Sequence, residues 1–209
     1  MKKSRWYFIS LAVVLSLLLL VNVIINFSCH TLLNYGITLI LVPGVTFLLA
    51  YLLGLLPKSF YNPFKKIFKV FRWEAKFYEA LGVRKYKERV PELGKVLTGF
   101  DKSKVDKPDD PEYIYTFLTE NTKGSFLHAI SIIWGVISIV PLIFIFKDYF
   151  IYSMAIPAIC INTFYHFLPL STLRYLRPRL IKLYNISLKK IERRKSNEKE
   201  WNSNCLCHR

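Results

Sequence analysis

Two histidines lie where membrane helices would meet polar surroundings, and an imidazole there could act as a general base. His128 follows the start of the apolar window Leu127–Phe146, and His166 lies near the end of the window Tyr149–Leu170. If the windows are helices that turn near Asp148, both rings lie roughly 27–30 Å from the turn at about 1.5 Å per residue. The two imidazoles are therefore expected at one depth. Because an imidazole can take a proton from a hydroxyl near neutral pH, we predict that His128 is catalytic. The alternative is an interfacial histidine that tolerates both media.

Two carboxylates could support such a base. Glu74 lies in the charged, aromatic-rich stretch "FRWEAKFYEALGVRKYKERVPELG", and Glu120 lies shortly before the second pair of apolar windows. On a helix, Glu74 falls about 60° from the centre of the apolar face, near the lipid side. A carboxylate held partly out of water can accept a proton near neutral pH, so Glu74 and Glu120 are also predicted to be catalytic. A structural pairing of Glu74 with Lys76 or Arg72 is the alternative.

Clusters of cations flank these residues and suit a phosphate-bearing substrate. One follows Gly82 in "VRKYKERV", and the other follows the last apolar window in "RYLRPRL". Arginine and lysine bind phosphate oxygens through charge-assisted hydrogen bonds, and they also hold anionic lipid headgroups. A solvated helix face and ordinary membrane-exit anchors are the alternative explanations. The predicted substrate-binding residues are Arg84, Lys85, Tyr86, Lys87, Arg174, Arg177 and Arg179.

Motifs of soluble enzymes are missing from the sequence. It has no G-x-S-x-G elbow, P-loop, dinucleotide-binding glycine set or H-E-x-x-H, and it lacks the H-x-x-x-x-D pattern of glycerolipid acyltransferases. Cys205, Cys207 and His208 supply too few fixed ligands for a metal. We therefore expect no metal and no resident cofactor.

Four apolar windows indicate a membrane protein. The chain of 209 residues is 53% hydrophobic and 16% aromatic and carries a formal net charge of +16, which is unusual for a soluble domain. About 20 apolar residues suffice to cross a bilayer as a helix. We predict an all-α integral membrane protein with four transmembrane helices and a cytoplasmic amphipathic helical cap. The windows, none with a charged residue, are Trp6–Ile25, Gly36–Leu56, Leu127–Phe146 and Tyr149–Leu170.

The charge distribution predicts the orientation. Three basic residues precede the first window, residues 57–126 hold 15 basic and 10 acidic residues, and the tail after Leu170 holds 11 basic and three acidic. The two remaining connections carry no net charge. This asymmetry predicts a multi-pass membrane protein with both termini and the central loop cytoplasmic. Topology thus explains the basicity, membrane lipids are the expected partner, and nucleic acid is not.

The chain divides into four predicted parts: an N-terminal transmembrane hairpin at 1–56, a helical loop at 57–126, a second hairpin at 127–170 and a basic tail at 171–209. In the loop, Asn62 and Pro63 predict the start of one amphipathic helix that ends at Gly82. A short helix should follow, and Asp110 before Pro111 predicts the start of another after a polar linker.

The charged segments resemble those of the glycosyl-4,4′-diaponeurosporenoate acyltransferase family, over about residues 71–180. The resemblance lies in the order of "FRWEAKFYEALGVRKYKERVPELG", "ENTKGSFLH" and "RYLRPRL". The family pattern has tryptophan, asparagine and an acidic residue where this chain has Tyr86, Leu176 and Ser125. The matched positions are Glu74, Tyr78, Val83, Arg84, Lys85, Lys87, Pro91, Glu120, Lys123, His128, Arg174, Tyr175, Arg177, Pro178, Arg179 and Leu180.

The resemblance implies a membrane O-acyltransferase of staphyloxanthin-type carotenoid biosynthesis, of which this chain would be a divergent member. Such an enzyme moves a fatty acyl chain from a thioester donor such as acyl-coenzyme A to a sugar hydroxyl of a glycosylated carotenoid or similar glycolipid. His128 would take the proton of that hydroxyl, with Glu120 or Glu74 in support. A non-catalytic four-span lipid-binding scaffold or accessory membrane protein is the alternative, and a transporter fits less well because ionisable residues within the windows are sparse.

Overall fold

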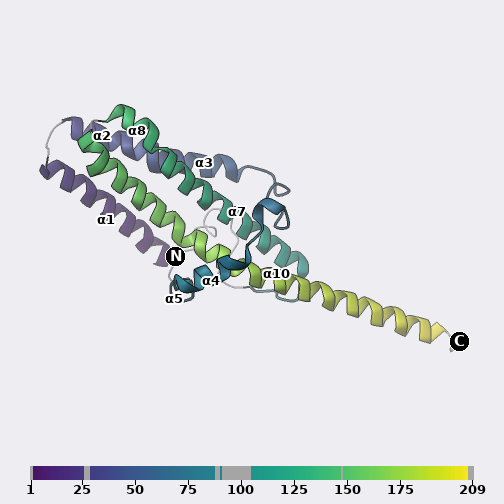
Figure 1. The fold of residues 1–209 in the computed structure, drawn as a ribbon. Helices are drawn as coiled ribbons and strands as arrows, with labels where there is room; N and C mark the ends of the chain where they lie inside the picture. The colour runs from purple at the N-terminus through teal and green to yellow at the C-terminus, as the bar shows by residue number, and fades with distance from the viewer. Residues whose placement is uncertain (1, 26–28, 88–89, 91–104, 147, 207–209) are drawn as a thin grey trace.

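The protein folds as a bundle of long helices, shown in Figure 1. The structure, a computed structural model, describes residues 2–25, 29–87, 90, 105–146 and 148–206, and within these ranges every regular element is a helix. This confirms the predicted all-α class. Residues 101–104 of the predicted polar linker 101–111, as well as Cys207 and His208, lie outside the described residues.

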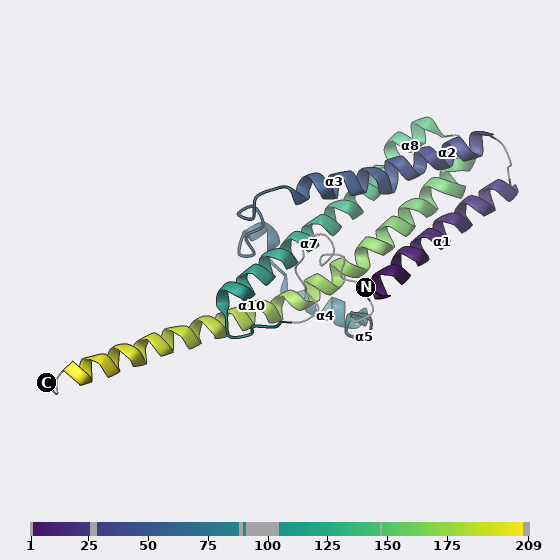
Figure 2. The same ribbon diagram turned by 180° about the vertical axis from the view of Figure 1, so that it is seen from behind.

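The bundle consists of an N-terminal hairpin packed beside a C-terminal one. In the first, α1 (Lys2–Ile25) is followed by α2 (Cys29–Leu39), the π-helical turn η1 (Ile40–Gly44) and α3 (Val45–Gly54). In the second, α7 (Pro111–Ile137) and α8 (Ile139–Ile145) lead through α9 (Asp148–Phe150) and η3 (Ile151–Ala155) into α10 (Ile156–Leu206). Both hairpins turn at one end of the bundle, the hairpin end (Figure 1). The charge-rich segment 57–87, which we call the cap, lies at the other end of the bundle, the basic end. Helix α10 continues past this end (Figure 2).

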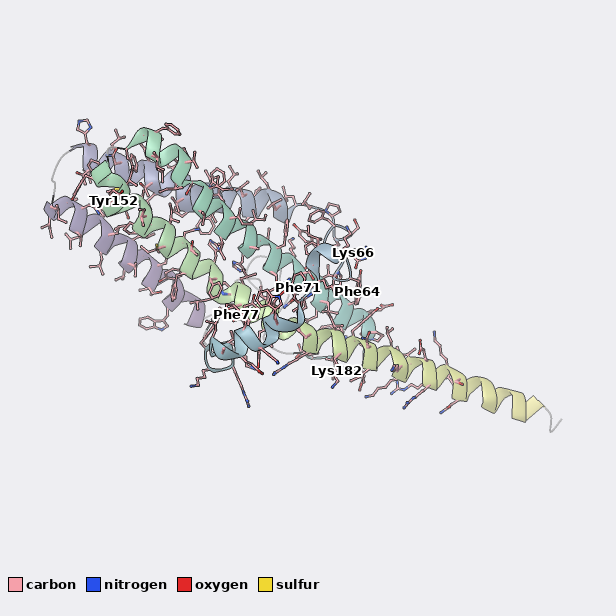
Figure 3. The ribbon with its side chains drawn as sticks, viewed as in Figure 1. Phe64, Lys66, Phe71, Phe77, Tyr152 and Lys182 are labelled. Atoms are coloured by element: carbon pink, nitrogen blue, oxygen red, sulfur yellow. The ribbon has the colours of Figure 1, made fainter. Side chains whose placement is uncertain are left out.

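Three helices are long and apolar enough to cross a membrane among the described residues: His30–Gly54, Pro111–Ile145 and Ile151–Glu198. They cover most of the second, third and fourth predicted spans, apart from one or two residues at an end of each. The apolar part of α1, Ile9–Ile25, is shorter, so the first span stays a prediction. Large apolar side chains cover the outside of the bundle, as Tyr152 illustrates in Figure 3, which suits a surface that faces lipid.

The apolar core near the hairpin end joins both hairpins. Val42, Leu142 and Met154 are fully buried there, from η1, α8 and η3. Pro43 lacks an N–H and lies inside η1, where the helix ladder changes to the wider π form. The indole Nε1 of Trp134 on α7 donates to the carbonyl of Leu41 at 2.9 Å. In a bilayer, where water would not reach this level, such a bond gives the backbone carbonyl of Leu41 a partner.

The helices α7 and α10 run antiparallel in close contact. At Gly135, an added Cβ would lie 2.5 Å from Nδ2 of Asn162, so any larger residue would require the Asn162 side chain to move. The same Nδ2 donates to the carbonyl of Ser131 at 3.2 Å. Small residues at such a crossing let two membrane helices approach closely.

The predicted single amphipathic helix from Asn62 to Gly82 is wrong, because the chain breaks it in two. A 3₁₀ turn, η2 (Lys66–Phe68), is followed by extended backbone at Lys69 and Phe71, and only then does α4 (Arg72–Ala80) begin. Phe68 is buried among aromatic rings that include Phe126 of α7, at a centroid distance of 5.8 Å. Packing on α7 thus outweighs the local helical pattern.

Other local signals in this region are confirmed. Asn62 Oδ1 accepts from the amide of Phe64 at 2.9 Å, as a capping residue would, although a turn rather than a long helix follows. Gly82 ends α4 in the left-handed conformation, with φ of 70°, and leads into the short helix α5 (Val83–Tyr86). Asp110 caps α7 by accepting from Glu112 N at 3.0 Å and Tyr113 N at 3.2 Å.

Candidate active site

A pair of histidines joins α7 to α10. Nδ1 of His128 lies 3.0 Å from Nδ1 of His166, and the ring centroids are 5.3 Å apart. Both side chains are half-buried. The equal depth predicted by counting residues from the turn is therefore confirmed, and the structure adds direct contact between the rings.

The contact between these rings fixes complementary roles. When both imidazoles are neutral, a hydrogen bond between two Nδ1 atoms requires one ring to donate Nδ1–H and the other to accept. The donating ring then has its lone pair at Nε2, and the accepting ring has its proton at Nε2. The pair thus presents one basic nitrogen and one N–H donor, which is the combination that a proton transfer needs.

A layer of polar side chains lies between the histidines and the basic end. Asn121 on α7 is buried and donates to the carbonyl of Leu173 on α10 at 3.2 Å. Nζ of Lys123 donates to the carbonyl of Gly54, the last residue of α3, at 2.7 Å. A cation at a helix C-terminus is favourable because the last carbonyls have no partner in the helix. Lys123 thereby links α7 to α3 between the histidine pair and the basic end.

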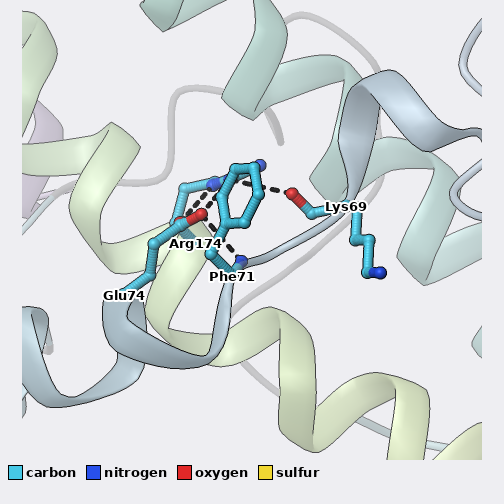
Figure 4. Close-up of polar contacts among 4 residues, drawn as sticks. All are labelled: Lys69, Phe71, Glu74 and Arg174. Atoms are coloured by element: carbon cyan, nitrogen blue, oxygen red, sulfur yellow. Dashed lines mark hydrogen bonds and ion pairs between the residues drawn. The ribbon is translucent and has the colours of Figure 1, made fainter.

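Glu74 and Arg174 form a two-pronged ion pair that fastens α4 to α10 (Figure 4). Oε1 of Glu74 lies 2.6 Å from Nη2 of Arg174, and Oε2 lies 2.9 Å from Nε. The same carboxylate accepts from the amide of Phe71 at the start of α4, at 3.0 Å. Nη2 of Arg174 also donates to the carbonyl of Lys69 at 3.2 Å. Four hydrogen bonds therefore meet at this ion pair, two of them to the backbone of Lys69 and Phe71, and the partner of Glu74 lies 100 residues away along the chain.

Apolar packing supports this junction. Tyr78 and Val83 are buried against Tyr175 of α10. Burial raises the pKa of Tyr78 above its ordinary value of 10.0; the charge of Glu74 adds to this shift and Arg174 opposes it. The hydroxyl of Tyr86 lies 2.8 Å from Oγ of Ser171, so α5 is also held on α10. Figure 3 shows the outward-facing Phe71 and Phe77 of the same segment, which are both exposed.

The predicted substrate-binding cations occupy different settings. Arg84 and Lys85 are exposed on α5, and Lys87 just after it is half-buried. Arg179 is exposed and stacks over the ring of Tyr175, with 4.8 Å from its guanidinium carbon to the centroid. Arg177, in contrast, is 1% exposed and donates from Nη2 to the carbonyl of Pro63 at 2.6 Å. Arg84, Lys85 and Arg179 are thus exposed to solvent, Lys87 is partly exposed, and Arg177 is not exposed.

The candidate catalytic residues lie on two levels. Glu120 is buried on α7 eight residues before His128, and Arg174 with its partner Glu74 lies eight residues after His166 on α10. Eight residues correspond to about 12 Å along a helix. The structure therefore brings His128 to His166 and Glu74 to Arg174. It places Glu74 and Glu120 about two helical turns from the imidazole pair, toward the basic end.

Some polar residues of the candidate site are not singled out by sequence reasoning. Ser171 and Asn121 carry no motif, and only their contacts with Tyr86 and Leu173 reveal them. His166 is noticeable in the sequence by its depth, although nothing there shows that it touches His128. Among the described residues, no group of three or more histidine, cysteine or carboxylate side chains could hold a metal.

One comparison with known proteins gives a match. The model of a protein family described as glycosyl-4,4′-diaponeurosporenoate acyltransferase matches residues 57–186, which is more than half of the chain and includes both levels of the site. Neither a curated protein nor a solved structure matches the chain.

Proposed function

Because the chain belongs to the glycosyl-4,4′-diaponeurosporenoate acyltransferase family, we propose that it transfers a fatty acyl chain from a thioester donor to a sugar hydroxyl of a glycosylated carotenoid or similar glycolipid. Family membership supports acyl transfer in carotenoid biosynthesis. The sugar acceptor, the thioester donor and the ester product are the further content of the proposal. A non-catalytic scaffold has no comparable support.

The observation that carries the mechanism is the contact of 3.0 Å between His128 and His166. In the proposed arrangement His128 donates Nδ1–H to His166, so that Nε2 of His128 is the general base. When Nε2 takes the proton of the sugar hydroxyl, His128 becomes positively charged. Its Nδ1–H bond to His166 then becomes charge-assisted and stronger, and this stabilises the ion pair that forms in the transition state.

The reaction then proceeds by addition and elimination. The sugar oxygen attacks the thioester carbonyl carbon as its proton moves to Nε2 of His128, and a tetrahedral intermediate forms. The Nε2–H of His166 is a suitable donor for the oxyanion of this intermediate. On collapse the carbon–sulfur bond breaks, the sulfur takes the proton from His128, and the ester is released.

In this proposal Glu74 and Glu120 act from the level nearer the basic end, away from the histidine pair. Glu74 holds Arg174 and the start of α4, and it therefore positions the cap over the lipid-facing helices rather than touching the reacting atoms. Glu120, on the same helix as His128, would accept a hydrogen bond from the sugar of the acceptor. Arg84, Lys85 and Lys87 are proposed to attract the phosphates of the donor, with Tyr86 beside them.

The proposed location is a bacterial cell membrane, with both termini and the cap on the cytoplasmic side. The three long apolar helices support membrane insertion, and the excess of basic residues at the basic end supports this orientation. A soluble thioester donor would then reach the cap directly, while the lipid-borne acceptor approaches within the leaflet.

The test is lipid mass spectrometry of bacteria that express the chain and are supplied with a glycosylated carotenoid precursor. Wild type should give a product heavier by one fatty acyl group. His128→Gln should lower its rate of formation by about 10²- to 10⁴-fold, the usual contribution of a general base. His166→Gln should also lower the rate and change its pH profile. His30→Gln is the matched control, since His30 is an exposed histidine on α2.

Near-normal turnover by His128→Gln, at equal protein level in the membrane, would refute the assignment of the base. A product on a different glycolipid would keep the mechanism and replace the acceptor. If wild type forms no product while another family member does so in the same host, the acyltransferase proposal is wrong.

A further inference from the structure

Arg177 is a buried guanidinium whose hydrogen-bonding capacity is mostly unused. Its Nη2 donates to the carbonyl of Pro63, and its Nε and Nη1 are buried without an acceptor among the described residues. The side chain is 1% exposed, so bulk water does not solvate these two nitrogens. Buried donors in proteins are nearly always paired, and an unpaired one requires an explanation.

The surrounding protein does not supply the missing acceptor. Glu74 is near enough to attract the charge of Arg177, but its two oxygens already bind Arg174 and the amide of Phe71. Arg174 is itself a cation and repels Arg177. The two unpaired nitrogens of Arg177 therefore need a partner that is an anion and has at least two acceptor oxygens. A phosphate meets both conditions, and the fork of a guanidinium matches its geometry.

The position of Arg177 relative to the histidine pair limits which phosphate could bind. Arg177 follows His166 by 11 residues on α10. Eleven residues at 100° each make three turns plus about 20°, so both side chains leave the same face of the helix. Their separation along the axis is about 16 Å. A ligand that contacts both His166 and Arg177 must therefore have its reacting carbon and its phosphate about 16 Å apart.

We propose that Arg177 binds the phosphate of a 4′-phosphopantetheine arm whose thioester lies at the histidine pair. About 13 covalent bonds separate the sulfur from the phosphorus in this arm, and at about 1.2 Å of advance per bond it spans about 16 Å when extended. This length equals the distance from His166 to Arg177. The inference rests on the proposed acyl transfer and specifies its donor, because the arm is common to acyl-coenzyme A and acyl carrier protein.

Arg177 is thereby assigned a different task from the exposed cations. Arg84 and Lys85 lie in solvent, where an ionic contact is screened and weak. A phosphate held by Arg177 would be shielded from water, where charge-assisted hydrogen bonds are stronger. Arg177 would therefore select donors by the phosphate next to the pantetheine, whatever group follows that phosphate.

The experiment compares two donors that differ by this phosphate. The purified full chain in lipid nanodiscs receives either acyl-4′-phosphopantetheine or acyl-pantetheine, and kcat/KM is measured for each. For wild type we expect a preference of about 10- to 100-fold for the phosphorylated donor, as expected for charge-assisted hydrogen bonds. Arg177→Lys and Arg177→Met should reduce the preference to within about threefold, chiefly by raising KM for the phosphorylated donor. Arg193→Met, an exposed arginine farther along α10, is the control and should keep the full preference.

Arg177→Lys guards against misfolding, because its ammonium keeps the charge and can still reach the carbonyl of Pro63. Binding of 4′-phosphopantetheine itself, measured by calorimetry, gives a readout without turnover. Binding by wild type that both Arg177 variants lose supports the site even if no donor is turned over, in which case only the proposed function falls. A donor preference that survives in both variants overturns the site while the acyltransferase stands. The absence of both binding and turnover overturns both proposals, and a comparison of acyl-coenzyme A with acyl carrier protein identifies the carrier.

Discussion

Two ion pairs among the described residues have the same length but differ in burial, and they should differ greatly in their contribution to stability. Glu74 and Arg174 lie 2.6 Å apart, with side chains only 5% and 18% exposed. Asp109 and Lys190 also lie 2.6 Å apart, but their side chains are 61% and 53% exposed. An exposed pair contributes little, whereas the removal of one partner from a buried pair leaves an uncompensated charge.

We expect Glu74→Ala to lower the free energy of unfolding by about 3 kcal/mol, because Arg174 loses its partner and the Phe71 amide loses its cap. Glu74→Gln should cost about 1 kcal/mol less than this, since an amide oxygen can still accept from Phe71. Arg174→Ala should resemble Glu74→Ala. In the double variant the two losses should overlap, leaving a coupling energy of about 2 kcal/mol. Asp109→Ala should have no measurable effect.

The assay is thermal unfolding of the purified chain in one detergent, together with the rate at which a protease cleaves residues 57–87. The Glu74 and Arg174 variants should release this segment from α10 and speed its cleavage, and the Asp109 variant should not. Additive losses in the Glu74/Arg174 double variant, or an equal loss in Asp109→Ala, would refute the argument that burial sets the strength of the pair.

Three further predictions concern other contacts. Gly135→Leu should separate α7 from α10 and destabilise the bundle by about 1–3 kcal/mol, as overpacking does, while Gly135→Ala should cost less because Asn162 can turn aside; both are checked by thermal unfolding in detergent, and equal stability of all three proteins would contradict the close approach. Trp134→Phe should cost about 1 kcal/mol because the carbonyl of Leu41 loses its donor, and an unchanged midpoint in the same assay would contradict this bond. Because burial raises the pKa of Tyr78, the folded protein holds this proton more tightly than the unfolded chain; the resulting stability is intact below pH 10, falls as the pH rises further, and should fall less in Tyr78→Phe, as pH-dependent unfolding would show.

Sequence patterns predicted the features of the fold that depend only on local geometry, such as helix ends and the depth of a residue along a helix. The depth of His128 and His166 follows from counting residues to a common turn, because the rise of a helix is constant. Asp110 is recognised as a cap because proline follows it, and Gly82 ends a helix because glycine accepts a positive φ. These signals need no knowledge of the rest of the fold.

Contacts between distant segments could not be predicted in this way. Glu74 pairs with Arg174 across 100 residues, and no local pattern distinguishes Arg174 from nearer cations such as Lys76. The break before α4 arises because Phe68 packs among the rings of α7, and a helical pattern drawn on one segment cannot include that competition. The unpaired N–H groups of Arg177 can be recognised only when the burial of its side chain is known.

The uninterrupted helix α10 has a consequence for how the protein can change in length. His166, Arg174 and Arg177 all lie on this one helix, so their relative directions are set by helical phase rather than by separate loops. A single inserted or deleted residue between His166 and Arg174 would turn everything after it by about 100° and move Arg174 away from Glu74. Insertion of a full seven residues would nearly restore the direction but would lengthen the helix by about 10 Å. The interval between these residues should therefore tolerate substitutions far better than changes in length, whereas the exposed part of α10 after Lys190 should accept both.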